Sequence, residues 1–250
     1  MIYVVLPIYN EAKNVRVLIG QLRHILPPSP YRIIAVDDGS TDRTLETLKE
    51  LTGKDLQVEN YRLNMNVGAA FATGIDAVLS QAKSNDVMVI MESDGTSDIR
   101  VLPALIAKIT EDSYDVAIAS RYIPGGGYAH FPFQRRIISS LANTVLRFLF
   151  PMPGVRDYTI FYRAYRVGVL RHMQEYFGRF GIIRTQGFVA NAELLAKLSF
   201  FTKRMTEVPF FYDYGKKRGE SKMNIFLMAT EYFVTFSYLR RIRDKINHSS

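Results

Sequence analysis

The sequence contains no cysteine, which excludes disulfide bonds and thiolate metal sites and says nothing about the redox state of its compartment. None of its uninterrupted apolar runs reaches the roughly 20 residues that a membrane-spanning helix needs. The first residues, MIYVVLPIYN, also lack the basic region and long apolar core of a signal peptide. Neither a disulfide-stabilised fold nor a membrane-spanning segment is therefore expected.

Two common phosphate-binding motifs are missing as well. No G-x-G-x-x-G follows a strand-like run and opens a helix, and the P-loop pattern does not occur. The histidines are scattered, and none stands at the spacing of metal ligands: His24, His130, His172 and His248. The sequence therefore predicts neither a dinucleotide fingerprint nor a histidine-bound metal.

The composition describes one large globular domain, or a domain with an appendage. Apolar residues make up 48% of the 250 residues, and the mean hydropathy is -0.02. A formal net charge of +8 favours an anionic partner, such as a phosphate-bearing substrate, a membrane surface or nucleic acid. No nucleic-acid-binding motif accompanies that charge, so nucleic acid is not the expected partner.

Strand-like and helical patterns alternate through the first part of the chain. The strand-like runs are IYVVLPIY, YRIIAVDD, DLQVENYRL and DVMVIME, and helical patterns cover residues 14–25, 41–51 and 68–81. Such alternation predicts an α/β fold, in which helices cover both faces of a mostly parallel sheet. In such sheets, ligands bind beyond the carboxyl ends of the strands.

Carboxylates stand where three of these strand-like runs end: Glu11, Asp37, Asp38, Glu92 and Asp94. We expect these side chains to meet in one crevice. Side chains two residues apart on a strand share a face, so Glu92 and Asp94 are predicted to project together, with Ser93 turned away. Two like charges this close repel each other unless a positive group sits between them. A solvated strand end is the alternative interpretation.

Structural interpretations also stay open for two glycine-containing segments. In DDGSTDRT, Gly39 permits a tight turn, and Ser40, Thr41 or Asp42 can cap a helix. That interpretation does not require two adjacent aspartates before the turn. In NMNVGAAFATGIDA, small residues could serve only to pack a helix closely on the sheet.

Taken together, these segments resemble a family 2 glycosyltransferase with the Rossmann-like GT-A fold. The resemblance rests on VVLPIYNEAKNV, IIAVDDGSTDRT, NVGAAFATG, VIMESDG and ASRYIPGGG. Later segments narrow it to the dolichol- or polyprenyl-phosphate sugar synthases: FPFQRRIISSLANTVLRFL, VRDYTIFYRAYR, NAELLAKL, TEVPFFY and RGESKMN. The resemblance covers roughly residues 2 to 225, and we expect a GT-A domain at residues 1–222 followed by a C-terminal amphipathic helix at residues 223–250.

The resemblance implies an inverting enzyme that moves a hexose from a GDP- or UDP-sugar to a polyprenyl or dolichyl phosphate. The residues that would hold the nucleoside are Pro7, Tyr9, Glu11, Asp37 and Asp38. The family's D-x-D position, which binds a divalent cation and through it the donor diphosphate, is occupied by Glu92, Ser93 and Asp94. Oxygen ligands of this kind suit Mg²⁺ or Mn²⁺.

The chain departs from the family pattern at two places. Relatives carry Asp-Ala-Asp-Leu-Gln or close to it, whereas this chain reads Glu-Ser-Asp-Gly-Thr from residue 92, so Asp94 is the favoured metal ligand. Glu92 is predicted to act on the metal directly or through water, and Thr96 replaces a longer amide that can assist the metal. At Ile160 and Phe161 relatives commonly carry a small residue and glycine, which leaves the donor sugar open.

Polar and mostly cationic residues match the family's acceptor and diphosphate side: Arg121, Arg135, Ser139, Arg218, Ser221 and Lys222. Arg121 and Arg135, together with Asp94, are the predicted catalytic residues, and Arg218 and Lys222 are also expected to bind the donor. A lipid phosphate is already ionised at neutral pH, so it needs positioning by cations and no general base. The alternative for Arg135 is a solvated basic start of a helix.

Two other functions stay open. Transfer to a saccharide hydroxyl would need a carboxylate base, for which Glu193 or Asp157 would be candidates. A catalytically silent nucleotide-sugar-binding protein is suggested only by the altered D-x-D segment. The sequence predicts no oligomeric state.

The C-terminal segment predicts an amphipathic helix, because apolar residues fall on one helical stripe: Ile225, Met228, Ala229, Tyr232, Phe236 and Leu239. Glu231 interrupts the apolar run, and basic residues follow it: Arg240, Arg241, Arg243 and Lys245. We interpret this segment as an interfacial helix at the anionic cytoplasmic face of a membrane. Docking on the protein's own core or on a second subunit is the alternative. Relatives sometimes continue into transmembrane helices, which we do not expect from the sequence given.

Overall fold

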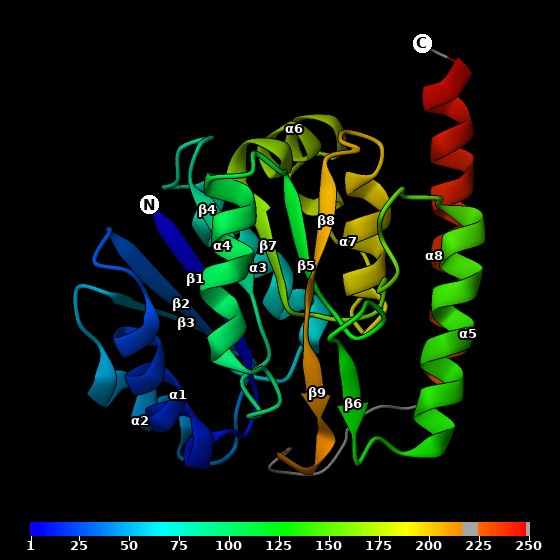
Figure 1. The fold of residues 1–250 in the computed structure, drawn as a ribbon. Coiled ribbons are helices and arrows are strands. Elements are labelled where there is room, and N and C mark those ends of the chain that lie inside the picture. The colour runs from blue at the N-terminus through cyan, green and yellow to red at the C-terminus, as the bar shows by residue number, and fades with distance from the viewer. Residues whose placement is uncertain (217–224, 249–250) are drawn as a thin grey trace.

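The computed structural model describes residues 1–216 and 225–248. Within them, the strands of a seven-stranded sheet follow the order β3-β2-β1-β4-β7-β5-β8 (Figure 1). These strands are β1 (Ile2–Ile8), β2 (Tyr31–Asp37), β3 (Leu56–Asn60), β4 (Val87–Ile90), β5 (Val116–Ser120), β7 (Arg163–Arg166) and β8 (Met205–Pro209). Neighbouring strands are parallel except at β7, which runs antiparallel to β4 and β5. The predicted mostly parallel sheet is confirmed.

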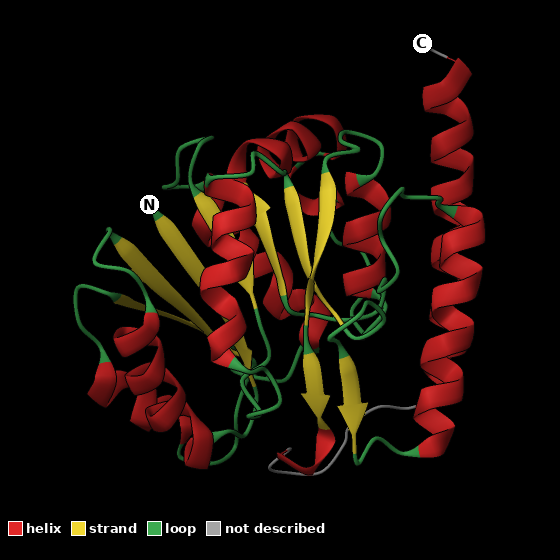
Figure 2. Cartoon of the chain, viewed as in Figure 1, coloured by secondary structure: helices red, strands yellow, loops and turns green. Residues whose placement is uncertain are grey.

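Helices cover both faces of the sheet (Figure 2). They are α1 (Ala12–Ile25), α2 (Thr44–Leu51), α3 (Val67–Leu79), α4 (Leu102–Thr110), α5 (Phe133–Leu149), α6 (Val167–Phe177), α7 (Ala190–Leu198) and α8 (Ile225–His248). Short 3-10 turns are η1 (Ile99–Val101), η2 (Arg179–Gly181) and η3 (Tyr214–Lys216). Helix α4 packs on β4, β5 and β7 in front of the sheet, and α3 packs on β1 and β2 from behind.

The first three predicted helices are present, with small differences at their ends. Helix α2 begins at Thr44 and not at residue 41, because the carboxylate of Asp42 accepts a hydrogen bond from the Thr44 backbone N–H at 2.9 Å. Residues 41–43 therefore belong to the turn before the helix. The turn in DDGSTDRT is therefore confirmed, whereas the N-cap residue is Arg43, whose side chain makes no capping bond, and not Ser40, Thr41 or Asp42.

The end of β4 differs from the prediction. The strand stops at Ile90, so the prediction that Glu92 and Asp94 stand on a strand was wrong, and both lie in the loop before η1. Gly95 turns this loop with a positive φ of 86°. Ser93 still points toward β1, since its hydroxyl donates a hydrogen bond to the Pro7 carbonyl oxygen at 2.8 Å.

The core lies between the sheet and its helices. β1 is apolar on both faces because helices cover both of them, and Val4, Val5 and Leu6 are fully buried. Small residues bring α3 close to its neighbours: a Cβ at Gly74 would lie 2.2 Å from Cγ1 of Val5. A Cβ at Gly68 would lie 2.0 Å from the Thr185 carbonyl oxygen. The packing interpretation of the small residues in this segment is therefore supported.

A second, two-stranded sheet joins β6 (Gly127–Ala129) to β9 (Phe211–Asp213) next to the start of α5 (Figure 1). Helices α5 and α8 lie side by side along one edge of the molecule. Arg243 of α8 donates a hydrogen bond to the Leu149 carbonyl oxygen at 2.6 Å, and the rings of Phe236 and Phe150 are 5.8 Å apart. The described part of α8 thus docks on the protein's own body.

Burial along α8 separates two faces. Phe236 and Leu239, which belong to the predicted stripe, are buried against the core, as the docking alternative predicted. Phe233 and Val234 are exposed, at 77% and 66% of their surface. The side chains of Ile225, Met228, Ala229 and Lys245 lie outside the described residues.

Candidate active site

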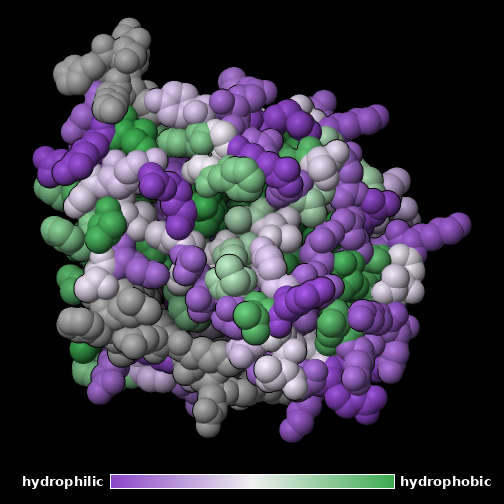
Figure 3. Space-filling model, turned by 180° about the vertical axis from the view of Figure 1, so that it is seen from behind, coloured by the Kyte–Doolittle hydropathy of each residue, from purple (hydrophilic) through white to green (hydrophobic). Residues whose placement is uncertain are grey.

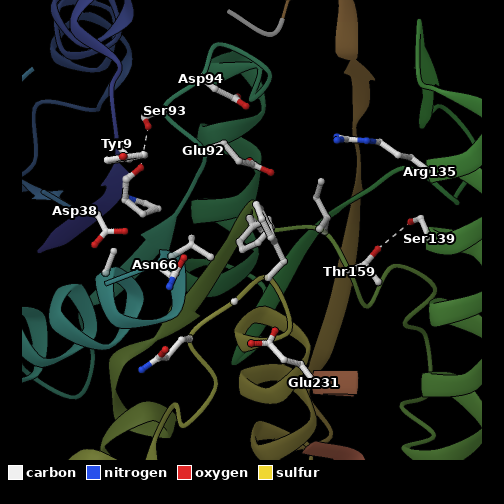
Figure 4. Close-up of a pocket in the computed structure, with 18 of the residues that line it drawn as sticks. Tyr9, Asp38, Asn66, Glu92, Ser93, Asp94, Arg135, Ser139, Thr159 and Glu231 are labelled. Carbon is white, nitrogen blue, oxygen red and sulfur yellow. Dashed lines mark hydrogen bonds between the residues drawn. The ribbon is translucent and has the colours of Figure 1, made fainter. Parts of the chain in front are cut away.

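A cavity of about 560 Å³ opens beyond the carboxyl ends of β1, β2 and β4, where α/β sheets bind ligands (Figure 4). Its walls continue onto α5 and α8. The residues predicted from the sequence that line it are Pro7, Tyr9, Glu11, Asp38, Glu92, Ser93, Asp94, Arg121, Arg135 and Ser139. Arg218, Ser221 and Lys222 lie outside the described residues.

Tyr9 and Asp38 lie on one side of this cavity (Figure 4). Asp38 accepts hydrogen bonds from the Met65 backbone N–H at 2.7 Å and from Asn64 Nδ2 at 3.1 Å. These bonds fix the chain between β3 and α3 against the end of β2. The adjacent Gly39 has a φ of 69°, and a Cβ there would lie 2.4 Å from the Leu63 carbonyl carbon. Asp38 therefore has a preorganised position at the cavity wall.

Asp37 is set back from the cavity. It is 1% exposed, and neither carboxylate oxygen has a hydrogen bond of normal geometry within the described part of the chain. Burial raises the pKa of Asp37, and the nearby Ser40 offsets only part of this increase. Its predicted contact with a nucleoside therefore has no support in the geometry, in contrast to Asp38.

Glu92 and Asp94 project into the cavity from the loop after β4 (Figure 4). Thr96 donates to Asp94 Oδ1 through its hydroxyl at 2.5 Å and its backbone N–H at 3.1 Å, which orients that carboxylate. Ser97 donates to the Glu92 carboxylate. Burial raises the pKa of Glu92, and the charge of Asp94 raises it further.

Two carboxylates that repel each other in this way would gain from a cation between or beside them. Among the side chains that the structure describes, no cluster of three or more histidine, aspartate or glutamate residues is suited to a metal. The two carboxylates fit a cation that takes its remaining oxygen ligands from a bound diphosphate and water, the usual arrangement for Mg²⁺. The site thus has the donor chemistry for a divalent metal, with substrate completing the shell.

Arg121 is held in a buried ion pair. Its Nε and Nη2 each donate to the Asp157 carboxylate at 2.8 Å, and Asp157 is fully buried. Burial disfavours both charges, yet the pKa of Arg121 stays above its usual value and that of Asp157 below, because each stabilises the other. Arg121 Nη2 also donates to the Thr159 hydroxyl at 2.8 Å. The charge of Arg121 is therefore already balanced within the protein.

Arg135 lies on the opposite side of the cavity from Tyr9, on the first turn of α5 (Figure 4). Its guanidinium lies 5.2 Å from the ring centre of Tyr214, a cation–π distance. Ser139, one helical turn further along α5, is 3.1 Å from the Thr159 hydroxyl. This end of the cavity therefore offers a cation and two hydroxyls to an anionic group.

Sequence patterns did not identify part of the cavity wall. Asn66, Gln186, Gly187, Phe188, Glu231 and Tyr232 all line it. Glu231 points into the cavity from α8 (Figure 4). The charged residue inside an otherwise apolar helical run was the one available signal for Glu231. Asn66 adopts a φ of 71°, unusual for a residue with a side chain. It opens the NVGAAFATG segment of the family resemblance, but the sequence assigned it no role in the site.

Asp157 and Glu193, the candidate bases for a hydroxyl acceptor, are both engaged in buried ion pairs. Asp157 is saturated by Arg121, as described above. Glu193 is also fully buried: it pairs with Lys197 and accepts hydrogen bonds from the backbone N–H groups of Arg184 and Thr185. Neither residue lines the cavity. Both therefore fix the architecture around the site.

The family model for glycosyl transferase family 2 matches residues 3–174 of the chain. Polyprenol monophosphomannose synthase of Mycolicibacterium smegmatis is 32% identical over 224 residues, which are 88% of this chain and 80% of that protein. Dolichol-phosphate mannosyltransferase of Pyrococcus furiosus is 32% identical over 241 residues, which are 96% of this chain and 62% of the relative. Undecaprenyl-phosphate mannosyltransferase of Micrococcus luteus is 28% identical, with 88% and 86% coverage.

Among solved structures, the chain resembles glucosyl-3-phosphoglycerate synthase from Mycobacterium tuberculosis, in complex with Mn²⁺, uridine diphosphate and phosphoglyceric acid. The TM-score is 0.69 at 15% identity, with coverage of 96% of this chain and 78% of that one. At this level of identity the match establishes the shared GT-A fold alone.

Proposed function

Because the chain belongs to glycosyl transferase family 2, we propose that it is an inverting enzyme that moves a hexose from a nucleotide-sugar to a polyprenyl or dolichyl phosphate. The names of its relatives favour mannose as the hexose and leave GDP and UDP both open as the nucleotide. The division into a transferase domain at residues 1–222 and a helix at 223–250 is part of this proposal, although α8 shares the cavity.

The main support for this proposal is the contrast between the two faces of α5. Arg135, Ile138, Ser139 and Ala142 line the cavity. Five apolar residues of the same helix are exposed at helical spacing: Phe133, Ile137, Leu141, Val145 and Phe148. One helix thus offers a cation to a phosphate on its inner face and an apolar stripe on its outer face. A polyprenyl phosphate combines the same two chemistries.

On the donor side, we propose that Pro7, Tyr9, Glu11 and Asp38 contact the nucleoside. Asp94, and Glu92 directly or through water, would hold Mg²⁺ or Mn²⁺, which in turn would neutralise charge on the departing nucleoside diphosphate. Thr96 would act mainly by orienting Asp94, since its hydroxyl already donates to that carboxylate. In two solved structures of similar fold the metal is Mn²⁺, bound in those proteins together with uridine diphosphate or uridine-diphosphate-glucose.

On the acceptor side, Arg135 is the residue we propose to hold the lipid phosphate, with Ser139 beside it. The phosphate oxygen is the nucleophile, and since it is already ionised, no side chain has to remove a proton. We assign Arg121 a positioning role, because its guanidinium is bound to Asp157 and directs Thr159 and Ser139. Arg218, Ser221 and Lys222 keep their proposed phosphate-binding roles on the sequence resemblance.

We propose peripheral binding at the cytoplasmic face of a membrane. No helix within the described residues is long and apolar enough to cross one. Hydrophobic groups gather among polar ones along the edge formed by α5 and α8, which is on the left in Figure 3. Exposed Arg240 and Arg241 follow on α8, and cations near anionic lipid contribute about 1 kcal/mol each. Vesicle binding should therefore weaken as salt rises.

Transfer to a saccharide hydroxyl is the competing function. It would need a base in the cavity, and the two candidates that the sequence suggested are buried in structural ion pairs. A catalytically silent binding protein is disfavoured because Asp94 and Glu92 both face the cavity.

The experiment that tests the proposal is a transfer assay with four combinations of substrate. GDP-mannose and UDP-glucose are each offered to a short prenyl phosphate and to a saccharide, with and without a metal chelator. We expect labelled sugar in the prenyl-phosphate product and its loss with chelator. Transfer only to the saccharide, or no transfer from any donor, would contradict the proposal.

A further inference from the structure

Glu231 is a carboxylate in the cavity for which the proposed chemistry has no use. It projects from α8 on the wall opposite Glu92 and Asp94, between the side that carries Asp38 and the side that carries Arg135 (Figure 4). The residue therefore faces the middle of the cavity, where a group joining the nucleotide to the acceptor phosphate would lie.

The surroundings of Glu231 leave hydrogen-bonding capacity for a ligand. Within the described chain, the backbone N–H of Gly187 donates a hydrogen bond to its carboxylate, whose two oxygens together can accept about four. A Cβ at residue 187 would lie 2.3 Å from Oε2 of Glu231, so the carboxylate fits against this segment only because residue 187 is glycine. Burial raises the pKa of Glu231, and the hydrogen bond from the Gly187 backbone offsets only part of this increase.

The charges around the cavity decide what Glu231 can bind. A carboxylate repels a phosphate. The groups proposed to hold phosphate lie elsewhere: Arg135 on α5, and the cation that Asp94 would bind. The neighbouring wall is apolar and aromatic: the rings of Phe161 and Phe188 are 5.8 Å apart, and Ile160 lies beside them. An uncharged ligand with hydroxyl groups fits a carboxylate set in such a wall, because hydroxyls donate and carbon-bound hydrogens pack on rings.

We infer that Glu231 accepts hydrogen bonds from hydroxyls of the donor hexose and contributes to the choice of sugar. This inference rests on the proposed function, since it assumes a nucleotide-sugar in the cavity. Because the same helix carries exposed Phe233 and Val234, the residue that contacts the sugar and the proposed membrane-facing surface belong to one element.

The test compares binding of a nucleoside diphosphate with binding of its sugar conjugate, so it does not depend on the acceptor. GDP and GDP-mannose, and UDP and UDP-glucose as the second pair, are titrated by calorimetry into wild type, Glu231→Gln and Glu231→Ala. Asp244→Asn is the matched control, because it makes the same carboxylate-to-amide change at an exposed site of the same helix. Melting temperatures check that each variant is folded.

We expect both Glu231 variants to bind the nucleoside diphosphate like wild type and its sugar conjugate on the order of tenfold or more weakly. Asp244→Asn should leave both affinities unchanged. If the Glu231 variants do not fold, Gly187→Ala serves instead: its methyl group displaces the carboxylate, and the same selective loss is expected.

Two results would overturn the inference. In the first, both folded Glu231 variants bind the sugar conjugate as tightly as wild type does, which would remove Glu231 from sugar recognition. In the second, diphosphate and conjugate affinities fall together, which would mark a structural role. If wild type binds the diphosphate but no sugar conjugate, the proposed function fails, and the inference fails with it.

Discussion

The donor end and the acceptor end of the cavity are built differently. At the donor end, Asp38 and Asp94 follow strands of the central sheet, and backbone N–H groups of Met65 and Thr96 fix their carboxylates. At the acceptor end, Arg135 stands on a helix at the edge of the molecule and stacks on Tyr214, in the 3-10 turn η3 that follows the small second sheet. The donor end is thus preorganised by the core, whereas the acceptor end depends on how peripheral helices pack.

This difference matches what each end would have to do. A nucleotide-sugar must be held by several polar contacts in one defined geometry, which rigid strand ends suit. A prenyl phosphate reaches the site from a membrane, so its side needs an exposed apolar surface next to the cation. Changes at the donor end should therefore act on chemistry and nucleotide affinity, and changes at the acceptor end on the use of the lipid.

The largest effect is expected at Asp94. Asp94→Ala should lower transfer by roughly a thousandfold or more, because the divalent cation that it would hold stabilises the leaving diphosphate by several kcal/mol. Chelation of wild type should have a similar effect, and Glu92→Gln should be milder. The measurement is single-turnover transfer with added Mn²⁺. Near-wild-type turnover in a folded Asp94→Ala protein would remove the metal from the donor end.

The ion pair behind the acceptor end should dominate stability. Asp157→Asn leaves Arg121 buried without its counter-charge, and breaking such a pair typically costs about 3–5 kcal/mol. The matched double variant, Arg121→Met with Asp157→Leu, should lose less, because no buried charge remains. Urea unfolding of wild type, Asp157→Asn and the double variant measures this. Equal losses in Asp157→Asn and the double variant would contradict it.

The same ion pair predicts how the free energy of unfolding changes with pH. Since the pKa of Asp157 is lower in the folded protein than in the unfolded chain, its contribution to stability is present above the ordinary carboxyl pKa of about 4. That contribution is lost as the pH falls through the lower, folded value. The difference in unfolding free energy between wild type and Asp157→Asn should therefore shrink on acidification. A constant difference between pH 7 and acid would contradict the assignment.

Arg135 should have a smaller effect, restricted to the acceptor. Arg135→Ala is expected to reduce kcat/KM for a prenyl phosphate by about ten- to a hundredfold, as for loss of a charged hydrogen bond, while nucleotide affinity stays intact. Arg136→Ala is the matched control, because Arg136 is the exposed neighbour that stacks on Tyr128 and does not line the cavity. Equal effects of the two substitutions would favour the solvated basic helix start.

Substitution of Asp38 should have the opposite selectivity: it should affect the donor and not the acceptor. Asp38→Ala is expected to weaken nucleoside diphosphate binding by about tenfold, through the lost carboxylate and the loosened segment at Met65. Calorimetry with GDP and UDP measures the change, and the KM for the acceptor should not move. Unchanged nucleotide affinity would count against Asp38 as a donor residue.

The contrast between the two ends also explains what the sequence could predict. Asp38 and Asp94 were identified because each follows an apolar strand directly, and local patterns capture such positions. Tyr9 was identified only through the family resemblance. The end of β4 was misplaced because strand periodicity continues into Glu92, whereas the turn at Gly95 decides the local geometry.

Glu231 and Phe188 were not predicted, because their place in the cavity depends on long-range packing. Phe188 follows the segment of residues 181–185, which the buried pair of Glu193 and Lys197 holds through hydrogen bonds to its backbone. Glu231 reaches the cavity only when α8 docks through Phe236 and Leu239. The antiparallel β7 is a four-residue strand between two partners distant in sequence, and nothing in RAYR indicates its direction.

The most direct test of the account measures the two faces of α5 with two forms of one acceptor. Transfer rates to a vesicle-embedded long prenyl phosphate and to a water-soluble short one are compared for wild type, Arg135→Ala and the outer-face variant Ile137→Ser/Leu141→Ser. We predict that Arg135→Ala lowers both rates, whereas the outer-face variant lowers only the vesicle rate. If Arg135→Ala leaves both rates intact, or the outer-face variant keeps the wild-type vesicle rate, the proposed lipid phosphate acceptor at a membrane surface is contradicted.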